Sequence, residues 1–146
     1  MSELMQRIAN VGVLEKTERV DLGDFDEVFR GAVFEVWLTP TRAHIEAWGE
    51  VRDWLKQETE RARRDRDRIR GEEKRRAFDA ESAERLQAGY DARLDAWLAE
   101  TWRNVELEEV RQIHAHLARV APPAWDWLVN ETHTAIGRFR RRAAGN

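Results

Sequence analysis

The histidines are the residues of this chain best able to bind a metal ion, and they are His44, His114, His116 and His133. His114 and His116 stand two positions apart, which places them on different faces of a helix, whereas helical zinc sites use pairs three or four apart. No acidic residue stands at ligand spacing, and without cysteine neither a thiolate site nor a disulfide can form. We interpret the histidines as structural and predict no metal and no other cofactor.

Nucleophilic and phosphate chemistry also lack their usual sequence patterns. The only serines are Ser2 and Ser82, and neither lies in a G-x-S-x-G turn. The eight glycines are scattered, so there is no phosphate-binding loop or dinucleotide fingerprint. Asp24 and Asp26 form a short acidic cluster, which in a loop is typical of turn chemistry. The sequence predicts a protein that is not an enzyme.

Two basic patches interrupt a chain whose formal net charge is −3. Residues 56–76 and 135–146 each carry a net charge of +4, against −5 for residues 1–55 and −6 for residues 77–134. Acidic residues interleave the first patch, which has no aromatic residue between 61 and 76 that could stack on a base. The pattern favours self-association or a protein partner and disfavours nucleic acid, which stays an alternative.

Tryptophan is unusually frequent, with seven residues in the chain. Three of them fall on the apolar stripes of expected helices and are assigned to the core: Trp48, Trp97 and Trp125. Three others fall off these stripes: Trp37, Trp102 and Trp127. Exposed tryptophans act as anchors of protein interfaces, whereas a small helical domain can also bury both sides of an element, so both interpretations stay open.

The N-terminal part of the chain predicts a β-hairpin over 17–38. Residues 1–16 show no sustained periodicity, and we expect them to be flexible. Residues 33–38, VFEVWL, alternate between two faces with the period of a half-buried strand. The segment at 18–22, ERVDL, can pair with them across a loop rich in glycine and aspartate. Two strands alone are marginal in water, so the hairpin must pack on helices or join the sheet of a partner.

A long helical hairpin is predicted over 39–103, with Thr39 as a cap and Pro40 in the first turn. Apolar residues recur at helical spacing from Ile45 to Leu55 and again from Leu86 to Thr101. Folding the chain back near Gly71 sets the two stretches against each other. The expected pairs are Ile45 with Leu98, Trp48 with Trp97, and Leu55 with Tyr90.

The outer half of this hairpin is the charged stretch RARRDRDRIRGEEKRR at 61–76. Opposite charges stand three or four positions apart, and each such pair stabilises an isolated helix by about 0.2–0.5 kcal/mol. The expected pairs are Glu60–Arg64, Asp65–Arg68, Asp67–Arg70 and Glu72–Arg76. A disordered linker would be rich in proline, serine and glycine, so we predict a solvated helical arm. One unbroken helix through Gly71 is the alternative geometry.

Two further helices are predicted over 104–142. Asn104 can cap the first, whose expected inward residues are Val110, Ile113, Leu117 and Val120. Two prolines at 122 and 123 end it and open the last helix. The inward face of that helix is expected to hold Trp125, Leu128, Thr132, Ile136 and Phe139, with Gly145 near its C-cap.

The predicted fold class is therefore mainly α: a small N-terminal β-hairpin, then a long charged helical hairpin and two C-terminal helices, in a single domain over 17–146. The first residues, MSELMQRIAN, lack the basic and apolar regions of a secretory signal. No apolar run approaches the length of about eighteen residues that a membrane span needs. The sequence thus predicts a cytoplasmic protein without a membrane partner.

Two stretches, VDLGDF…VFEVWLTPTRAHIEAW within 20–48 and PPAWDWLVNETHTAIGRFRR at 122–141, resemble the small tail assembly chaperones of long-tailed, siphovirus-type bacteriophages. Those proteins are similar in their short N-terminal hairpin, threonine-rich strand-to-helix junction and small helical domain. The resemblance covers 17–55 and 97–142, while the charged arm at 56–88 departs from the family. It implies a non-catalytic role in the host cytoplasm: binding the helical tape-measure protein and helping tail-tube subunits gather around it.

We therefore predict a tail assembly chaperone that binds its client through exposed tryptophans and a free hairpin edge, and whose charged blocks make contacts between copies in a homo-oligomer. The predicted partner-binding residues are Trp37, Trp102, Trp127, Arg138, Arg140, Arg141 and Arg142. One alternative is a structural or adaptor protein with a coiled-coil arm, although residues 56–85 lack an apolar seam. The other is a nucleic-acid-binding accessory protein with salt-sensitive binding through Arg140–Arg142.

Overall fold

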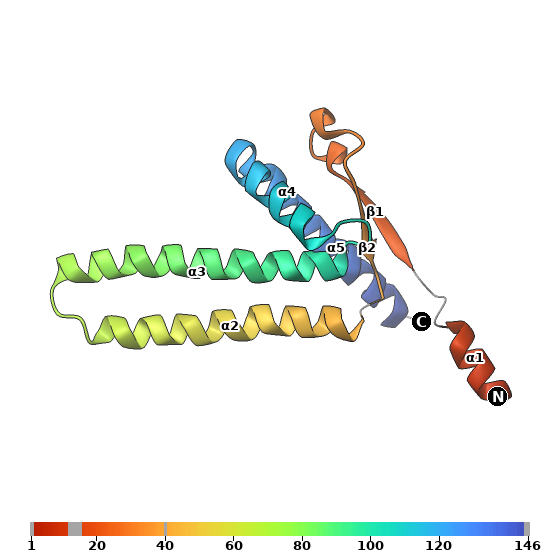
Figure 1. Cartoon of the computed structure of the whole chain (residues 1–146), viewed down its shortest axis with the longest axis horizontal. Helices are drawn as coiled ribbons and strands as arrows, with labels where there is room; N and C mark the ends of the chain where they lie inside the picture. Colours follow the sequence, from red (N-terminus) through yellow and green to blue (C-terminus); the bar gives the residue numbers. More distant parts are fainter. Residues whose placement is uncertain (1, 12–15, 40, 145–146) are drawn as a thin grey trace. The chain divides into compact units, whose positions relative to one another are not determined.

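The computed structural model describes residues 2–11, 16–39 and 41–144 (Figure 1). The fold is mainly α with a two-stranded sheet near the N-terminus, which confirms the predicted fold class. The elements are α1 (Glu3–Val11), β1 (Thr17–Asp21), the 3-10 turns η1 (Leu22–Asp24) and η2 (Glu27–Phe29), β2 (Val33–Trp37), α2 (Arg42–Asp67), α3 (Glu72–Thr101), α4 (Leu107–Val120) and α5 (Pro122–Ala144).

The chain forms two compact units. One consists of residues 1–41 and 101–146 and is called the hairpin unit below. The other consists of residues 42–100 and is called the arm. The predicted single domain over 17–146 did not include this division, which follows from α2 and α3 pairing with each other along one continuous stretch of chain.

The N-terminal segment contains helix α1, where the sequence predicts no regular element. Ser2 caps this helix, because its Oγ accepts a hydrogen bond from the backbone N–H of Met5 at 3.1 Å. Arg7 forms an ion pair with Glu3 one turn away, also at 3.1 Å. These contacts are local, and a helix of nine residues is too short for a sustained periodicity to reveal it.

Strands β1 and β2 form the predicted antiparallel hairpin, with Val20 opposite Phe34. The alternation of β2 is also confirmed, since Phe34 and Val36 are buried and the residues between them are half-buried. The hairpin therefore has one face toward the core and one toward solvent.

The loop between the strands is built from short-range polar contacts. The Asp21 carboxylate accepts a hydrogen bond from Gly23 N–H at 2.7 Å, and that of Asp26 accepts one from Val28 N–H at 3.0 Å. Gly31 then turns the chain toward β2 with a φ of 91°, a conformation that favours glycine. Of the two aspartates predicted to shape a turn, Asp24 and Asp26, the Asp26 side chain does so, and Asp21 does the same.

The other edge of β2 is covered by the segment that follows α3. Trp102 forms an isolated antiparallel bridge with Val36. The backbone N–H of Arg103 donates to the carbonyl oxygen of Glu35 at 2.8 Å. This part of the hairpin edge is therefore not free for a client, contrary to the prediction.

Asn104 completes the cover of β2. Its side-chain oxygen accepts from Glu35 N–H and its side-chain nitrogen donates to the Val33 carbonyl, both at 2.9 Å. The predicted role of Asn104 as a helix cap is wrong, because its amide is engaged on the strand. Helix α4 begins at Leu107 instead, and its N-cap residue is Glu106.

Aromatic side chains form the core of the hairpin unit around Trp102, which is 1% exposed. The Trp102 ring lies 4.5 Å from the ring of Phe34 and 6.3 Å from that of Trp125. Its Nε1–H donates to Thr132 Oγ1 at 3.2 Å, which satisfies the one polar atom of the indole. His114 stacks on the Trp125 ring, with 4.1 Å between the two ring centroids.

In the arm, α2 and α3 run antiparallel, as predicted over 39–103 (Figure 1). The predicted pair of Trp48 and Trp97 is confirmed, with ring centroids 5.1 Å apart. His44 is buried beside them, and its Nε2 accepts a hydrogen bond from Trp97 Nε1–H at 3.3 Å. Helix α2 begins at Arg42, after the predicted cap Thr39; Pro40 lies outside the described residues.

The inward face of α2 differs from the predicted apolar stripe. Ile45 and Leu55 are 56% and 38% exposed, so neither is buried as the prediction of the pairs Ile45–Leu98 and Leu55–Tyr90 expects. Val51, which flanks the predicted stripe, is buried, and so is His44. The reason is that a buried histidine holds the first inward position, so a stripe drawn through apolar residues that begins at Ile45 is rotated away from the contact face.

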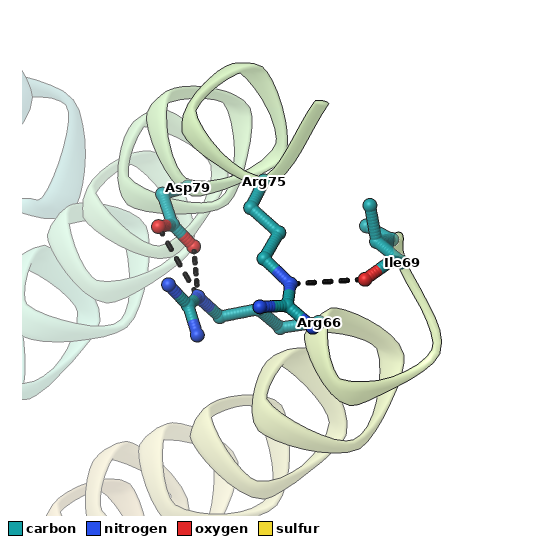
Figure 2. A network of polar contacts seen from close by, with 4 residues as sticks. All are labelled: Arg66, Ile69, Arg75 and Asp79. Carbon is teal, nitrogen blue, oxygen red and sulfur yellow. Dashed lines mark hydrogen bonds and ion pairs between the residues drawn. The ribbon is translucent and has the colours of Figure 1, made fainter. Parts of the chain in front are cut away.

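The outer end of the arm is closed by a turn before α3, and Figure 2 shows the side chains that hold it. Arg66 of α2 reaches Asp79 of α3, with Nε 3.0 and 3.2 Å from the two carboxylate oxygens. Arg75 Nε donates to the carbonyl oxygen of Ile69 at 2.9 Å. Gly71 has a φ of 100°, so the chain reverses there and the alternative of one unbroken helix is excluded.

The predicted ion pairs of the arm are confirmed in part. Glu72 and Arg76 pair at 3.0 Å across one turn of α3. The pairs expected for Arg68 and Arg70 are wrong as helical pairs, because α2 ends at Asp67 and both arginines follow it in the turn. Periodicity within one helix could not foresee the Arg66–Asp79 pair, which joins two helices.

The two C-terminal helices follow the prediction closely. Helix α4 ends at Val120 and Pro122 opens α5. Val120 is 54% exposed and not inward, because it is the last residue of its helix. Gly145, the expected C-cap, lies outside the described residues. No helix in the described ranges is long and apolar enough to span a membrane.

Candidate protein-binding groove

A groove with a mainly apolar lining lies in the hairpin unit, between the loop that joins β1 to β2 and helix α4. Its volume is about 470 Å³. The residues that line it are Leu22, Phe29, Ala32, Phe34, Glu109, Gln112, Ile113, His116 and Leu117.

The floor of the groove is part of the core, and its walls are partly open to solvent. Leu22, Phe34 and Leu117 are 3–5% exposed and form the floor. Phe29 and Ile113 are half-buried and stand on opposite walls, one in the 3-10 turn η2 and one on α4. Because the Asp26 cap fixes η2, the Phe29 wall is positioned by the same hydrogen bond that shapes the loop.

The rim of the groove is polar. Glu109, Gln112 and His116 are exposed and stand three or four positions apart on α4, next to Ile113. An apolar channel with a polar rim suits an amphipathic helix, which inserts side chains spaced one turn apart and leaves its polar face in water. The rim carboxylate of Glu109 favours a helix with a basic residue beside its apolar stripe.

The histidines do not gather at one site. His114 is buried against Trp125, whereas His116 is exposed on the rim of the groove. Among the residues that the structure describes, no group of three or more histidine, aspartate or glutamate side chains could hold a metal ion.

Two groups outside the groove have shifted pKa values. Burial lowers the pKa of His133 below its ordinary value of 6.5. Burial, with a smaller effect of the neighbouring Asp91 carboxylate, raises the pKa of Tyr90.

The prediction that Trp102 binds a partner is wrong. This side chain is buried in the centre of the hairpin unit, and its Nε1–H already has a partner in Thr132. Of the two readings of the off-stripe tryptophans, core packing therefore holds for Trp102. Trp102 belongs to a segment that pairs with β2, so the periodicity of a helix could not predict which way its side chain faces.

Trp37 and Trp127 are half-buried and contact different neighbours. The Arg103 guanidinium lies 5.3 Å from the Trp37 ring centroid, within the range of a cation–π contact. Trp127 of α5 lies 6.0 Å from Phe25 of the hairpin loop, which is 39% exposed. These two tryptophans keep partial exposure, and neither lines the groove.

The arginines of the predicted site fall into two groups. Arg138 pairs with Glu18 of β1 and Glu131 of α5, each at 3.6 Å, so it joins α5 to the hairpin. Arg140–Arg142 are exposed and form no ion pair with any residue in the described ranges. The structure thus does not bring the seven predicted residues into one site.

The groove itself was not predicted. Ile113 and Leu117 were assigned to the core, and Phe29 was not singled out. The signal that could have revealed the groove is Val28-Phe29, an apolar pair in a loop otherwise rich in aspartate and glycine. Which member of that pair faces α4 depends on the turn η2.

A second hollow, of about 530 Å³, lies on the arm along α2. Its residues are Glu46, Gly49, Glu50, Asp53, Trp54, Gln57 and Arg93. Arg93 lies over the Trp54 ring at 4.3 Å from its centroid, so the main aromatic surface there is already covered. The groove of the hairpin unit therefore offers more apolar surface to a partner.

Comparisons of the chain with protein-family models, with curated proteins and with solved structures gave no match.

Proposed function

We propose that this protein is a non-catalytic chaperone that holds an amphipathic helical segment of a client protein in the groove between the hairpin loop and α4. The client that the sequence resemblance suggests is the helical tape-measure protein of a phage tail, bound while tail-tube subunits gather around it. The single observation that carries the proposal is the open apolar groove with its polar rim.

The groove suits a helix better than an extended peptide. Strand addition needs a free sheet edge, and residues 102–104 occupy the edge of β2. A helix needs only an apolar surface for side chains at i, i+4 and i+7, and the lining that includes Phe29 and Ile113 offers one. A tape-measure protein, which is long and largely helical, would present many such segments.

The experiment is a pull-down of the tagged full-length protein from nuclease-treated cells that express the surrounding gene set, read by mass spectrometry. We expect one long helical polypeptide to be recovered. Phe29→Asp places a charge in the groove and should abolish recovery, because the carboxylate would be desolvated by the client.

Val28→Asp is the matched control, since Val28 is the neighbouring residue and is 78% exposed. It should recover the client as the wild type does. Equal recovery by both variants, or no long helical polypeptide in any sample, would contradict the proposal.

A nucleic-acid-binding accessory role is the second candidate, and exposed Arg140–Arg142 favour it. It predicts that recovered partners disappear on nuclease treatment and that binding weakens steeply with salt. Changing all three arginines to glutamine would then abolish binding, while Phe29→Asp would leave it intact.

A further inference from the structure

Helix α1 has an apolar face that is not covered. Leu4, Met5 and Ile8 are 67%, 50% and 55% exposed. At 100° per residue these side chains lie within about one quarter of the helix circumference, with Leu4 and Ile8 one turn apart. The helix is therefore amphipathic, and its apolar stripe has the spacing that a groove accepts.

A helix as short as α1 needs a surface to pack on. Isolated helices shorter than about 12–15 residues are marginal in water, and α1 has nine residues. Its Ser2 cap and its Glu3–Arg7 pair are contacts between exposed residues, which stabilise a helix only slightly. Burial of the three apolar side chains is the further stabilisation that the chain itself offers.

The groove of the hairpin unit offers this face an apolar lining and a charge opposite to that of Arg7. It is apolar, and Phe29 and Ile113 stand on its two walls. Arg7 lies at the edge of the apolar stripe of α1, next to Leu4. Glu109 on the rim forms no ion pair with any described residue, so it can bind Arg7 in place of Glu3, the exposed partner of Arg7 within α1.

We infer that α1 of one copy docks into the groove of a second copy, with Leu4 and Ile8 between the two walls and Arg7 against Glu109. Docking in the same copy is disfavoured by length. Six residue steps separate Val11 from Thr17 and span at most roughly 20 Å. The groove begins five strand residues beyond Thr17, roughly 17 Å away, so docking in the same copy would use nearly all of that maximum reach.

This contact is heterologous, because each copy offers a helix on one side and a groove on the other. Such a contact closes into a two-fold dimer when two copies exchange their helices, and builds rings or open chains when they do not. The inference needs no client, although a client helix that uses the same groove would compete with α1.

The test is self-association of the purified full-length protein, measured by sedimentation velocity over a range of concentrations. Wild type should form dimers or larger species. Ile8→Asp should weaken association at least about tenfold, whereas Gln6→Asp, on the polar face of α1, should leave it unchanged. Phe29→Asp should weaken it to a similar degree, with Val28→Asp as its control.

Mixing distinguishes docking between copies from docking within one. The Ile8→Asp chain keeps a working groove and the Phe29→Asp chain keeps a working helix, so their mixture should form one-to-one dimers that stop there. Glu109→Arg gives a test that leaves the core untouched: it should weaken association about fivefold to tenfold, and adding Arg7→Glu should restore it.

A monomeric wild type, Ile8→Asp that associates normally, or a mixture that stays monomeric would each overturn the inference. Circular dichroism of every variant establishes that it is folded. The client pull-down with Ile8→Asp separates the two proposals, because that variant lacks self-association but retains the groove.

Discussion

The hairpin unit and the arm are stabilised in different ways. In the hairpin unit, Trp102 contacts a strand and a helix at once, and its polar atom is satisfied inside the core. In the arm, ring contacts between Trp48 and Trp97 lie near one end, and ion pairs between exposed side chains close the other.

The difference concerns how many elements each contact joins. Loss of Trp102 would separate elements far apart in the chain, whereas a contact of the arm joins two helices that a single turn already connects. We therefore expect core substitutions in the hairpin unit to lower the free energy of unfolding strongly. Substitutions in the arm should have smaller effects, which decrease toward its solvated tip.

The largest expected effect is that of Trp102→Ala. It removes a fully buried ring and leaves Thr132 without its side-chain partner, so the free energy of unfolding should fall by about 3–5 kcal/mol. Urea unfolding followed by circular dichroism measures this. Trp37→Ala, at a half-buried position, is the control and should cost about 1 kcal/mol or less. Equal losses of unfolding free energy in the two variants would contradict the view that Trp102, and not Trp37, stabilises the hairpin unit.

Glycine substitutions in the arm should give effects of opposite sign. A Cβ at Gly89 would overlap the Trp54 ring, so Gly89→Ala should destabilise the protein by about 1–3 kcal/mol despite the better helix propensity of alanine. Gly49 has open space around it, and Gly49→Ala should stabilise by up to about 1 kcal/mol. Thermal unfolding of the two variants measures both effects. If both variants were more stable than the wild type, the Trp54 ring would move away from the new Cβ at little cost, contrary to the prediction.

Acidification should destabilise the hairpin unit through His133. Its pKa is lowered in the folded state, so the unfolded chain binds a proton first as the pH falls through about 6.5. As the pH falls from about 6.5 to the lowered pKa of the folded state, the free energy of unfolding therefore decreases, by no more than about 1.4 kcal/mol per pH unit. His133→Asn should lose this component of the pH dependence, seen by comparing urea midpoints at pH 7.5 and 5.5 with those of the wild type. Parallel curves for the two proteins would argue against it.

The smallest effect is expected at the tip of the arm. Arg66 and Asp79 have side chains 46% and 49% exposed, so their pair should contribute about 1 kcal/mol or less and weaken with salt. A double-mutant cycle with Arg66→Ala and Asp79→Ala measures the coupling energy. A coupling as large as the cost of Trp102→Ala would contradict the view that the tip is held weakly.

Much of the fold could be predicted from local patterns. Alternation predicted β2, the spacing of Trp48 and Trp97 predicted the apolar end of the helical hairpin, and Gly71 predicted its turn. Each of these rests on residues whose period or backbone preference is evident within a short window.

The candidate site could not be predicted in the same way. Trp102 and Asn104 were misassigned because residues 102–104 leave the helix and pair with β2, more than sixty positions earlier in the chain. The groove was missed because its walls come from a loop and from a distant helix, and no single segment contains its pattern.

The sequence by itself determined the class of the protein: the hairpin, the arm with its charged outer half, the two C-terminal helices and the positions of the turns. These follow from side-chain periodicity, from proline and from glycine, which act over a few residues. Only the tertiary structure decided which tryptophan is buried, which strand edge is covered and where an apolar groove stays open. Burial is set by contacts between distant segments, and those contacts exist only once the chain has folded.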